Sequence, residues 1–220
     1  MSEPRTARSR RTRAAIVAAV REELRRASSF SVEAVVARAG CSPATYYSHF
    51  PSKDDALAEA FGFVLADLER VFAELFELDA LRALGVDGFA SRAETESVRF
   101  FRSEALVFRA GLARLPEHPE IRDRYRATEQ ATLRHIAGFL SEAGKAGLLP
   151  SAAVAERASA VVVLSQGLNN PRLLRASPQD PVHRMLAGAL AALLSGDACG
   201  AAVSGVKLQK PRRRAKRRRA

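Results

Sequence analysis

The side chains best suited to chemistry lie within residues 31–53, which read SVEAVVARAGCSPATYYSHFPSK. Thr45 can hydrogen-bond the edge of a base or offer its methyl group to thymine. Tyr47, His49 and Lys53 carry groups that suit the oxygens of a phosphate backbone. This is the chemistry of nucleic-acid binding, and it requires that the chain bring these side chains to one surface.

Two short helices joined by a tight turn would position these side chains. Ser31 can cap a helix over residues 32–39, because its hydroxyl can accept an unpaired N–H of the first turn. Gly40 falls where that helix must stop and the chain takes a positive φ. Ser42 caps the next helix, expected at about 43–49, and Pro43 stands at its first position, where the missing N–H costs nothing. The spacing predicts a helix-turn-helix, whose second helix enters the major groove of DNA.

The period of the second helix separates an inner side from an outer side. Tyr46 and Phe50 have the type and spacing of core residues, as do the valines of the preceding helix. Tyr47 alone could equally be a half-buried tyrosine, His49 a capping residue and Lys53 a solvated one. The prediction rests on their occurring together with two caps, a turn and a basic flank. The predicted DNA-binding residues are Ser31, Ser42, Pro43, Ala44, Thr45, Tyr47, His49 and Lys53.

Charge is distributed unevenly along a chain whose formal net charge is +11. Residues 1–53 hold ten Lys or Arg against four Asp or Glu, residues 54–206 hold sixteen against twenty, and residues 207–220 hold nine against none. Basic ends on an acidic body indicate that a polyanion is met at the ends. Arg8, Arg10 and Arg11 could follow the DNA backbone or enter a narrow minor groove. Charged ends that merely aid solubility are the alternative.

Several classes of protein are disfavoured by the sequence. No apolar run of about 18 residues is present, so we expect no membrane span. The basic N-terminus leads into an amphipathic helix and has no cleavage site, which predicts a cytoplasmic protein. No nucleophile triad, carboxylate pair, phosphate loop or metal spacing occurs, so we expect neither an enzyme nor a cofactor or metal. Cys41 could sense redox state, although a lone cysteine is more often a small packing residue.

Helical periodicity and breakers predict an all-α chain of about nine helices and no strand. After a first helix over residues 10–26, Ser52 and Asp55 form a capping-box pattern that opens a long fourth helix. Further helices are expected at about 92–112, 120–143, 152–168 and 181–195. The predicted domains are a flexible basic arm (1–9), a helix-turn-helix domain (10–51), an effector-binding and dimerisation domain (52–196) and a disordered basic tail (197–220).

The stretch AGCSPATYYSHFPSKDDAL closely resembles the helix-turn-helix signature of TetR-type (tetracycline-repressor-like) bacterial regulators. That signature is a glycine turn, a short Thr-x-Tyr helix, an aromatic residue, then Ser-Lys and an acidic residue before a leucine. The matching residues here are Gly40, Thr45, Tyr47, Phe50, Lys53 and Leu57. The motif covers residues 10–60, and the rest agrees in helix count, lengths and order. Two departures are Ala27-Ser28-Ser29 in place of a common glycine, and the tail 207–220.

The resemblance implies a repressor-like homodimer that reads a palindromic operator in double-stranded DNA. A small effector bound in the larger domain would shift the two reading heads and release the operator. Such coupling between two sites is usually about 1–3 kcal/mol. The helix that starts at Ser52 would be the link, because it touches DNA at its N-terminus and the effector further along.

Residues for the effector and for the dimer follow from apolar stripes. Aromatic residues would favour a hydrophobic effector, oriented by the polar Glu104 and His135, whereas ordinary core packing is the alternative. The predicted pocket is Phe61, Leu65, Phe100, Glu104, Phe108, His135 and Phe139. Small residues among leucines in the last two helices allow close helix approach between subunits, or packing within one subunit. The predicted interface is Val161, Val162, Ser165, Leu168, Leu186, Ala189, Leu190 and Leu193.

One other function fits the charge pattern. A constitutive or architectural DNA-binding protein needs no effector, and the nine positive charges of residues 207–220 could give it salt-sensitive affinity for phosphates. An accessible cavity in the larger domain would disfavour that alternative.

Overall fold

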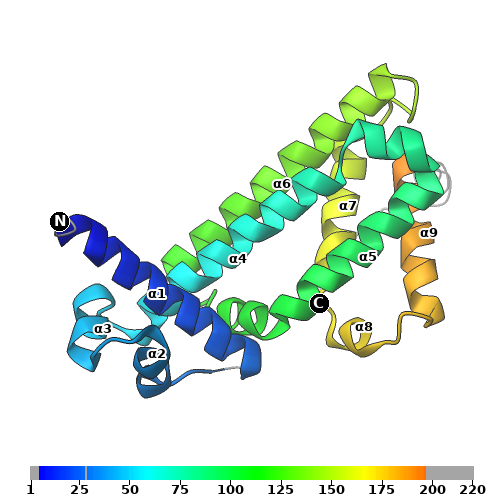
Figure 1. The fold of residues 1–220 in the computed structure, drawn as a ribbon. Helices are drawn as coiled ribbons and strands as arrows, with labels where there is room; N and C mark the ends of the chain where they lie inside the picture. The colour runs from blue at the N-terminus through cyan, green and yellow to red at the C-terminus, as the bar shows by residue number, and fades with distance from the viewer. Residues whose placement is uncertain (1–4, 28, 197–220) are drawn as a thin grey trace, which may run out of the picture.

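The computed structural model describes residues 5–27 and 29–196, and every regular element in these ranges is a helix (Figure 1). This confirms the predicted all-α class. The helices of this part of the chain are α1 (Arg5–Arg26), α2 (Val32–Ala39), α3 (Pro43–His49), α4 (Lys53–Leu75), α5 (Leu78–Leu112), α6 (Pro119–Lys145), α7 (Val154–Gly167), α8 (Pro171–Arg175) and α9 (Pro181–Ser195).

Local capping chemistry fixes the bounds of α2 and α3, which begin and end where the sequence predicts. The Ser31 hydroxyl accepts the N–H of Ala34 at 3.1 Å, and the Ser42 hydroxyl accepts that of Thr45 at 3.1 Å. Gly40 ends α2 with φ of 66°, a left-handed conformation that glycine adopts without steric cost. Together they form the predicted turn between two short helices.

The first helix is longer than predicted. It begins at Arg5, so residues 5–9 of the expected flexible arm are already helical. The Thr12 hydroxyl donates to the Arg8 carbonyl at 3.1 Å in this added turn, and alanine and arginine are good helix formers. Residues 1–4 of the arm and the whole predicted tail, 197–220, lie outside the described residues.

Two other differences from the expected helices have local causes. The predicted helix over 92–112 is the second part of α5, which starts at Leu78 and is kinked at Gly85, with φ 65° and ψ 175°. Within α5 the backbone leaves helical geometry at Gly85, so two helical segments meet at this glycine. The short helix α8 was missing from the prediction, since five residues are too few to show a period. It begins with Pro171 and is capped by the Asn170 side chain.

Two hydrophobic clusters form the core along the length of the molecule. The first joins α1–α3 to the N-terminal half of α4 and the C-terminal half of α5, through residues such as Tyr46, Phe61 and Phe108. The second lies at the other end, where the rings of Phe76, Phe89 and Phe139 meet. The predicted domain boundary after residue 51 therefore runs through a continuous core.

The arrangement places the helix-turn-helix at one end of the molecule. In Figure 1, α1–α3 lie together at that end, and α4 runs from them toward the far end beside α6. α7 packs on α6, and α9 packs on α5. Among the described residues, no helix is both long and apolar enough to cross a membrane.

Candidate nucleic-acid interface and effector cavity

The outer surface of α3 is formed by small and polar side chains with one large aromatic. Pro43, Ala44 and Ser48 are exposed, and Tyr47 is 52% exposed. Thr45 is partly buried, and its hydroxyl lies 2.9 Å from that of Ser42. A large exposed aromatic ring beside small residues is a surface that can approach DNA closely.

Tyr46 anchors the inner side of α3. It is fully buried, and its ring lies 5.2 Å from that of Tyr47 and 5.9 Å from that of Phe50. Its hydroxyl is buried without a hydrogen-bond partner among the described residues. Burial, assisted by the nearby Tyr47, Asp55 and Asp54, raises the pKa of Tyr46 to about 12. The inward prediction for Tyr46 and Phe50 is confirmed, since both are fully buried.

Arg13, which is not among the predicted site residues, joins α3 to its neighbours. Its Nε donates to Glu59 of α4 at 2.9 Å, and its Nη1 donates to the carbonyl of His49, the last residue of α3, at 2.7 Å. Its guanidinium lies 4.2 Å from the ring centroid of Phe50. One α1 side chain thus fixes the C-terminal end of α3 against α4. A single arginine at this spacing gives no signal in the sequence, because its partners are 36 and 46 residues away.

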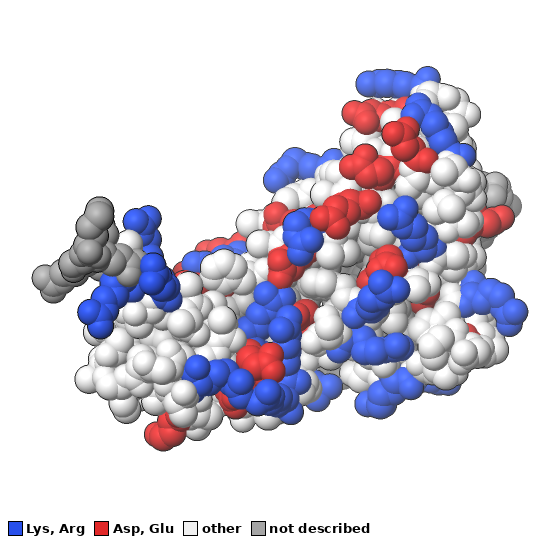
Figure 2. Space-filling model, in the orientation of Figure 1, with Lys and Arg blue, Asp and Glu red and all other residues white. Residues whose placement is uncertain are grey.

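The predicted phosphate-binding residues lie around α3. Lys53 is exposed at the first position of α4, with its Nζ 4.9 Å from the centroid of the Phe30 ring. His49 is partly buried at the end of α3, and Ser31 is exposed at the start of α2. Figure 2 shows Lys and Arg gathered at the N-terminal end of α1, beside a mostly uncharged surface over α2 and α3. Positive charge thus lies to one side of the mostly uncharged outer surface of α3.

A second feature is a cavity enclosed by α4, α5, α6 and α7. Its volume is about 80 Å³, smaller than the roughly 300–1,000 Å³ of a site for a drug-sized ligand. Apolar side chains from α4 and α5 form one wall, and polar side chains from α6 and α7 form the other. The lining residues are Leu68, Phe72, Phe101, Phe108, Leu112, Tyr125, Thr128, Glu129, Thr132, Val162, Ser165, Gln166 and Asn169.

Of the residues predicted for an effector pocket, Phe108 alone lines this cavity. Phe61 and Leu65 are core residues, and Phe100 packs at the edge of the same cluster. Phe139 stacks on Phe89 at 5.3 Å in the far cluster.

The two polar residues of the predicted pocket also lie elsewhere. Glu104 forms ion pairs with Arg21 and Arg25. His135 lines two open depressions, one of about 540 Å³ that it shares with Phe139 and one of about 390 Å³. The polar residues of α6 were not among the predicted pocket residues, although they share a helical face by spacing. They are Tyr125, Thr128, Glu129 and Thr132.

Comparison with known families decides what the first part of the chain is. Residues 16–60 match the family model described as bacterial regulatory proteins of the tetR family. The N-terminal part of the chain belongs to the TetR family. The matched segment begins in α1, contains α2 and α3, and ends in the first turns of α4. It therefore includes the exposed surface of α3 and the N-cap residues of α2 and α3, Ser31 and Ser42.

Solved structures extend the likeness to the whole fold. A protein from Mesorhizobium loti assigned to the TetR family has a TM-score of 0.65 at 18% identity, over 90% of this chain and 98% of that chain. A TetR-family protein from Rhodococcus sp. gives 0.63 at 20% identity, over 84% and 100%. GusR of Salmonella enterica gives 0.61 at 16% identity, over 88% and 98%. The chain thus has the fold of TetR-family transcriptional regulators. None of the curated proteins matches it in sequence.

The last helices of this TetR-type fold expose different residues from those predicted for a dimer interface. Val161, Val162, Ser165, Leu168 and Leu190 are buried within the subunit, because α7 packs on α6 and α9 packs on α5. Leu186 and Leu193 are partly buried, and Ala189 is exposed.

The outward faces of the same two helices carry other apolar side chains. Val163 of α7 is 67% exposed, and Met185 of α9 is 74% exposed. The predicted stripes thus pack mainly within one subunit, while apolar surface remains on the opposite faces.

Proposed function

We propose that this chain is a ligand-responsive transcriptional regulator, which binds a palindromic operator as a homodimer and is released by a small apolar effector. The observation that carries the proposal is the exposed surface of α3, a helix held in place by the Ser42 cap, the buried Tyr46 and the Arg13 contact with His49. Because its target is DNA, we place the protein in the cytoplasm of a bacterial cell. We propose no catalytic role and no cofactor.

In this proposal, the residues of α3 divide into two roles. Ala44 and Thr45, beside Pro43, face base edges in the major groove, where a threonine or alanine methyl can contact thymine. Tyr47, His49 and Lys53 contact phosphates and set the register, together with the helix N-termini capped by Ser31 and Ser42.

A homodimer supplies the second reading head. We assign the subunit contact to the outward faces of α7 and α9, which carry the exposed Val163 and Met185 together with Ala189. A two-fold interface uses the same patch on both subunits. Two copies would place their α3 helices in successive major grooves, about 34–36 Å apart on the operator.

The cavity is the proposed effector site. α4 connects it to the DNA end, because Lys53 stands at the first position of this helix while Leu68 and Phe72 line the cavity. An effector that shifts α4 would therefore move the residues at its DNA end. The presence of a cavity also disfavours a purely architectural protein.

Selection of bound duplexes from a random DNA pool tests the proposal. The expected product is a palindrome whose half-sites are about one helical turn apart. The second candidate, a DNA-binding protein without sequence preference, is favoured by the nine positive charges of residues 207–220. It predicts no enriched sequence, and binding that is lost when the chain ends at Ser204 or when salt is raised.

A further inference from the structure

The proposed function does not specify the chemistry of the effector, and the residues of α6 that line the cavity bear on it. Tyr125, Thr128, Glu129 and Thr132 all line the cavity from this one helix. Their spacing of three, four and seven residues places them on one face. A polar stripe beside apolar side chains can orient the polar group of a ligand that enters the cavity.

Two threonines of α6 place hydroxyl groups in the cavity lining. Thr128 is 7% exposed and Thr132 is 8% exposed, one turn apart. Within residues 5–27 and 29–196, no hydrogen bond joins either hydroxyl to another residue. Each hydroxyl can therefore accept from or donate to a molecule in the cavity.

Glu129 gives the cavity its charge. It is the one charged side chain among the described lining residues, and no Lys, Arg or His accompanies it. Its Oε1 accepts from the Gln166 side-chain N–H at 2.6 Å, so the carboxylate is held at the cavity wall. Burial, together with the charge of Glu129, raises the pKa of the Tyr125 hydroxyl. An anionic molecule would meet repulsion here, and a cation would meet attraction.

The opposite wall limits the size and shape of the ligand. Phe72, Phe101 and Phe108 line it together with Leu68 and Leu112. A volume of about 80 Å³ suits a body no larger than a single ring. Aromatic walls also favour a cation, because ring faces attract positive charge.

We infer that the effector is a small aromatic or aliphatic amine, bound with its apolar body against α4 and α5 and its ammonium group at Glu129. This inference rests on the proposed effector site and specifies the ligand class that the site selects. The hydroxyls of Thr128 and Thr132 would accept the remaining N–H donors of the ammonium group.

The test compares three probes of nearly equal size with different charge, which are 2-phenylethylamine, 2-phenylethanol and phenylacetate. Binding to the full chain is measured by isothermal titration calorimetry at pH 7. We expect the order amine, alcohol, acid in decreasing affinity. Glu129→Gln should weaken the amine by about tenfold and leave the alcohol nearly unchanged, since only the ammonium group loses a charge-assisted hydrogen bond. Glu142→Gln, an exposed position on the same helix, is the matched control.

The outcomes separate the ligand class from the site. Tighter binding of phenylacetate or of phenylethanol would overturn the amine assignment and leave the cavity as an effector site. Binding that is unaffected by Glu129→Gln would also overturn it. If none of the three probes binds, both the amine assignment and the effector cavity are contradicted.

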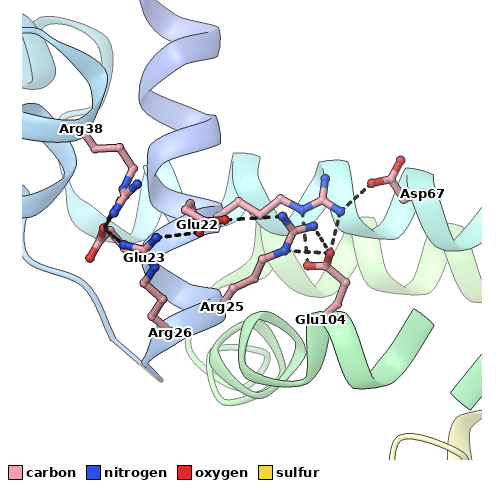
Figure 3. A network of polar contacts seen from close by, with 8 residues as sticks. Glu22, Glu23, Arg25, Arg26, Arg38, Asp67 and Glu104 are labelled. Carbon is pink, nitrogen blue, oxygen red and sulfur yellow. Dashed lines mark hydrogen bonds and ion pairs between the residues drawn. The ribbon is translucent and has the colours of Figure 1, made fainter. Parts of the chain in front are cut away.

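An independent observation concerns the polar network that joins α1 to α4 and α5 (Figure 3). Glu104 of α5 is 1% exposed, and its Oε1 accepts from Arg21 Nη2 at 2.9 Å and from Arg25 Nε at 3.0 Å. Arg21 Nη2 also donates to Asp67 Oδ2 of α4 at 2.6 Å. Figure 3 shows Arg25 of α1 pointing toward Glu104.

This network stands between the two proposed sites. Arg21 and Arg25 belong to α1, which packs on α2 and therefore moves with the helix-turn-helix. Asp67 directly precedes the cavity residue Leu68, and Glu104 lies between the cavity residues Phe101 and Phe108. Breaking a buried ion pair on one side leaves charge uncompensated, so the network resists a change in the angle of α1.

We propose that Glu104 is a positioning residue that fixes the angle of the reading head and, in the proposed dimer, the spacing between the two α3 helices. This proposal rests on the proposed function, because spacing has meaning only for two half-sites. In this proposal the Glu104 network is a second connection, in addition to α4, between the body and the helix-turn-helix.

A library of two half-sites separated by spacers of varied length tests this role, with the full chain as the binding protein. We expect the wild type to enrich one spacer length and Glu104→Gln to accept neighbouring lengths as well. Glu96→Gln is the control, because its ion pair with Arg99 lies within α5 and touches no other helix. Arg25→Gln, at a more exposed position, should broaden the spacing in the same direction if Glu104→Gln folds poorly.

Two results would count against the positioning role. If both Glu104→Gln and Arg25→Gln keep the single wild-type spacing, Glu104 does not set the reading geometry. If the wild type itself enriches no paired half-sites, the failure lies with the proposed function.

Discussion

At the scale of single residues, Tyr46 and Tyr47 are chain neighbours in opposite surroundings. Tyr46 is fully buried with an unpartnered hydroxyl, whereas Tyr47 is 52% exposed on the proposed reading surface. We predict that Tyr46→Phe raises the free energy of unfolding by about 1 kcal/mol, because it removes a buried polar group that lacks a partner. Tyr47→Ala should lower DNA affinity and leave stability nearly unchanged. Urea unfolding and operator titration of both variants check this contrast.

The raised pKa of Tyr46 predicts that the free energy of unfolding depends on pH in the alkaline range. The pKa of Tyr46 is raised to about 12 in the folded chain from an ordinary value of 10.0. Between these two pH values the hydroxyl ionises in the unfolded chain but stays protonated in the folded chain, which favours unfolding. The contribution of this proton equilibrium to stability is therefore complete below pH 10 and is lost as the pH rises toward 12. The stability advantage of Tyr46→Phe over the wild type should therefore grow between pH 10 and pH 12. An advantage that stays constant across this range would contradict the assignment.

At the scale of elements, Gly85 determines the path of α5. Its φ of 65° and ψ of 175° lie in a region that is essentially restricted to glycine. We predict that Gly85→Ala lowers the free energy of unfolding by about 1–3 kcal/mol. Gly138→Ala is the matched control, because Gly138 is an exposed helical position on α6 with open space around it. That change should stabilise by about 0.5–1 kcal/mol. Equal changes in the free energy of unfolding for the two variants would contradict a requirement for glycine at the kink.

The elements that the sequence predicts well are those fixed by neighbours in the chain. α2 and α3 begin and end as predicted, because Ser31, Gly40 and Ser42 act within four residues of themselves. The cavity could not be located in this way, since its lining combines four helices through tertiary packing. Glu104 shows the limit most plainly. Its polarity beside an apolar stripe suggested a ligand contact, but its partners Arg21 and Arg25 stand 83 and 79 residues away.

At the scale of the whole molecule, a DNA-binding end and a cavity lie along one elongated helical body with apolar surface left on α7 and α9. We predict that Val163→Asp or Met185→Asp shifts a homodimer toward monomer by more than about tenfold, because each change appears twice in a two-fold interface and buries a charge. Leu84→Asp, at an exposed apolar position on α5, is the control. Sedimentation equilibrium across protein concentrations measures the shift. Monomers from the wild type, or equal dissociation by Leu84→Asp, would contradict the assigned interface.

The central claim is that the outer surface of α3 reads DNA sequence. The most direct measurement is the ratio of affinities for a selected operator and a scrambled duplex of equal length. It would compare the wild type, Thr45→Ala combined with Tyr47→Ala, and a chain ending at Ser204. We predict that this ratio, typically 10³–10⁷ for specific DNA-binding proteins, collapses in the double variant and survives loss of the tail. A ratio kept by the double variant, or lost with the tail alone, would contradict the account.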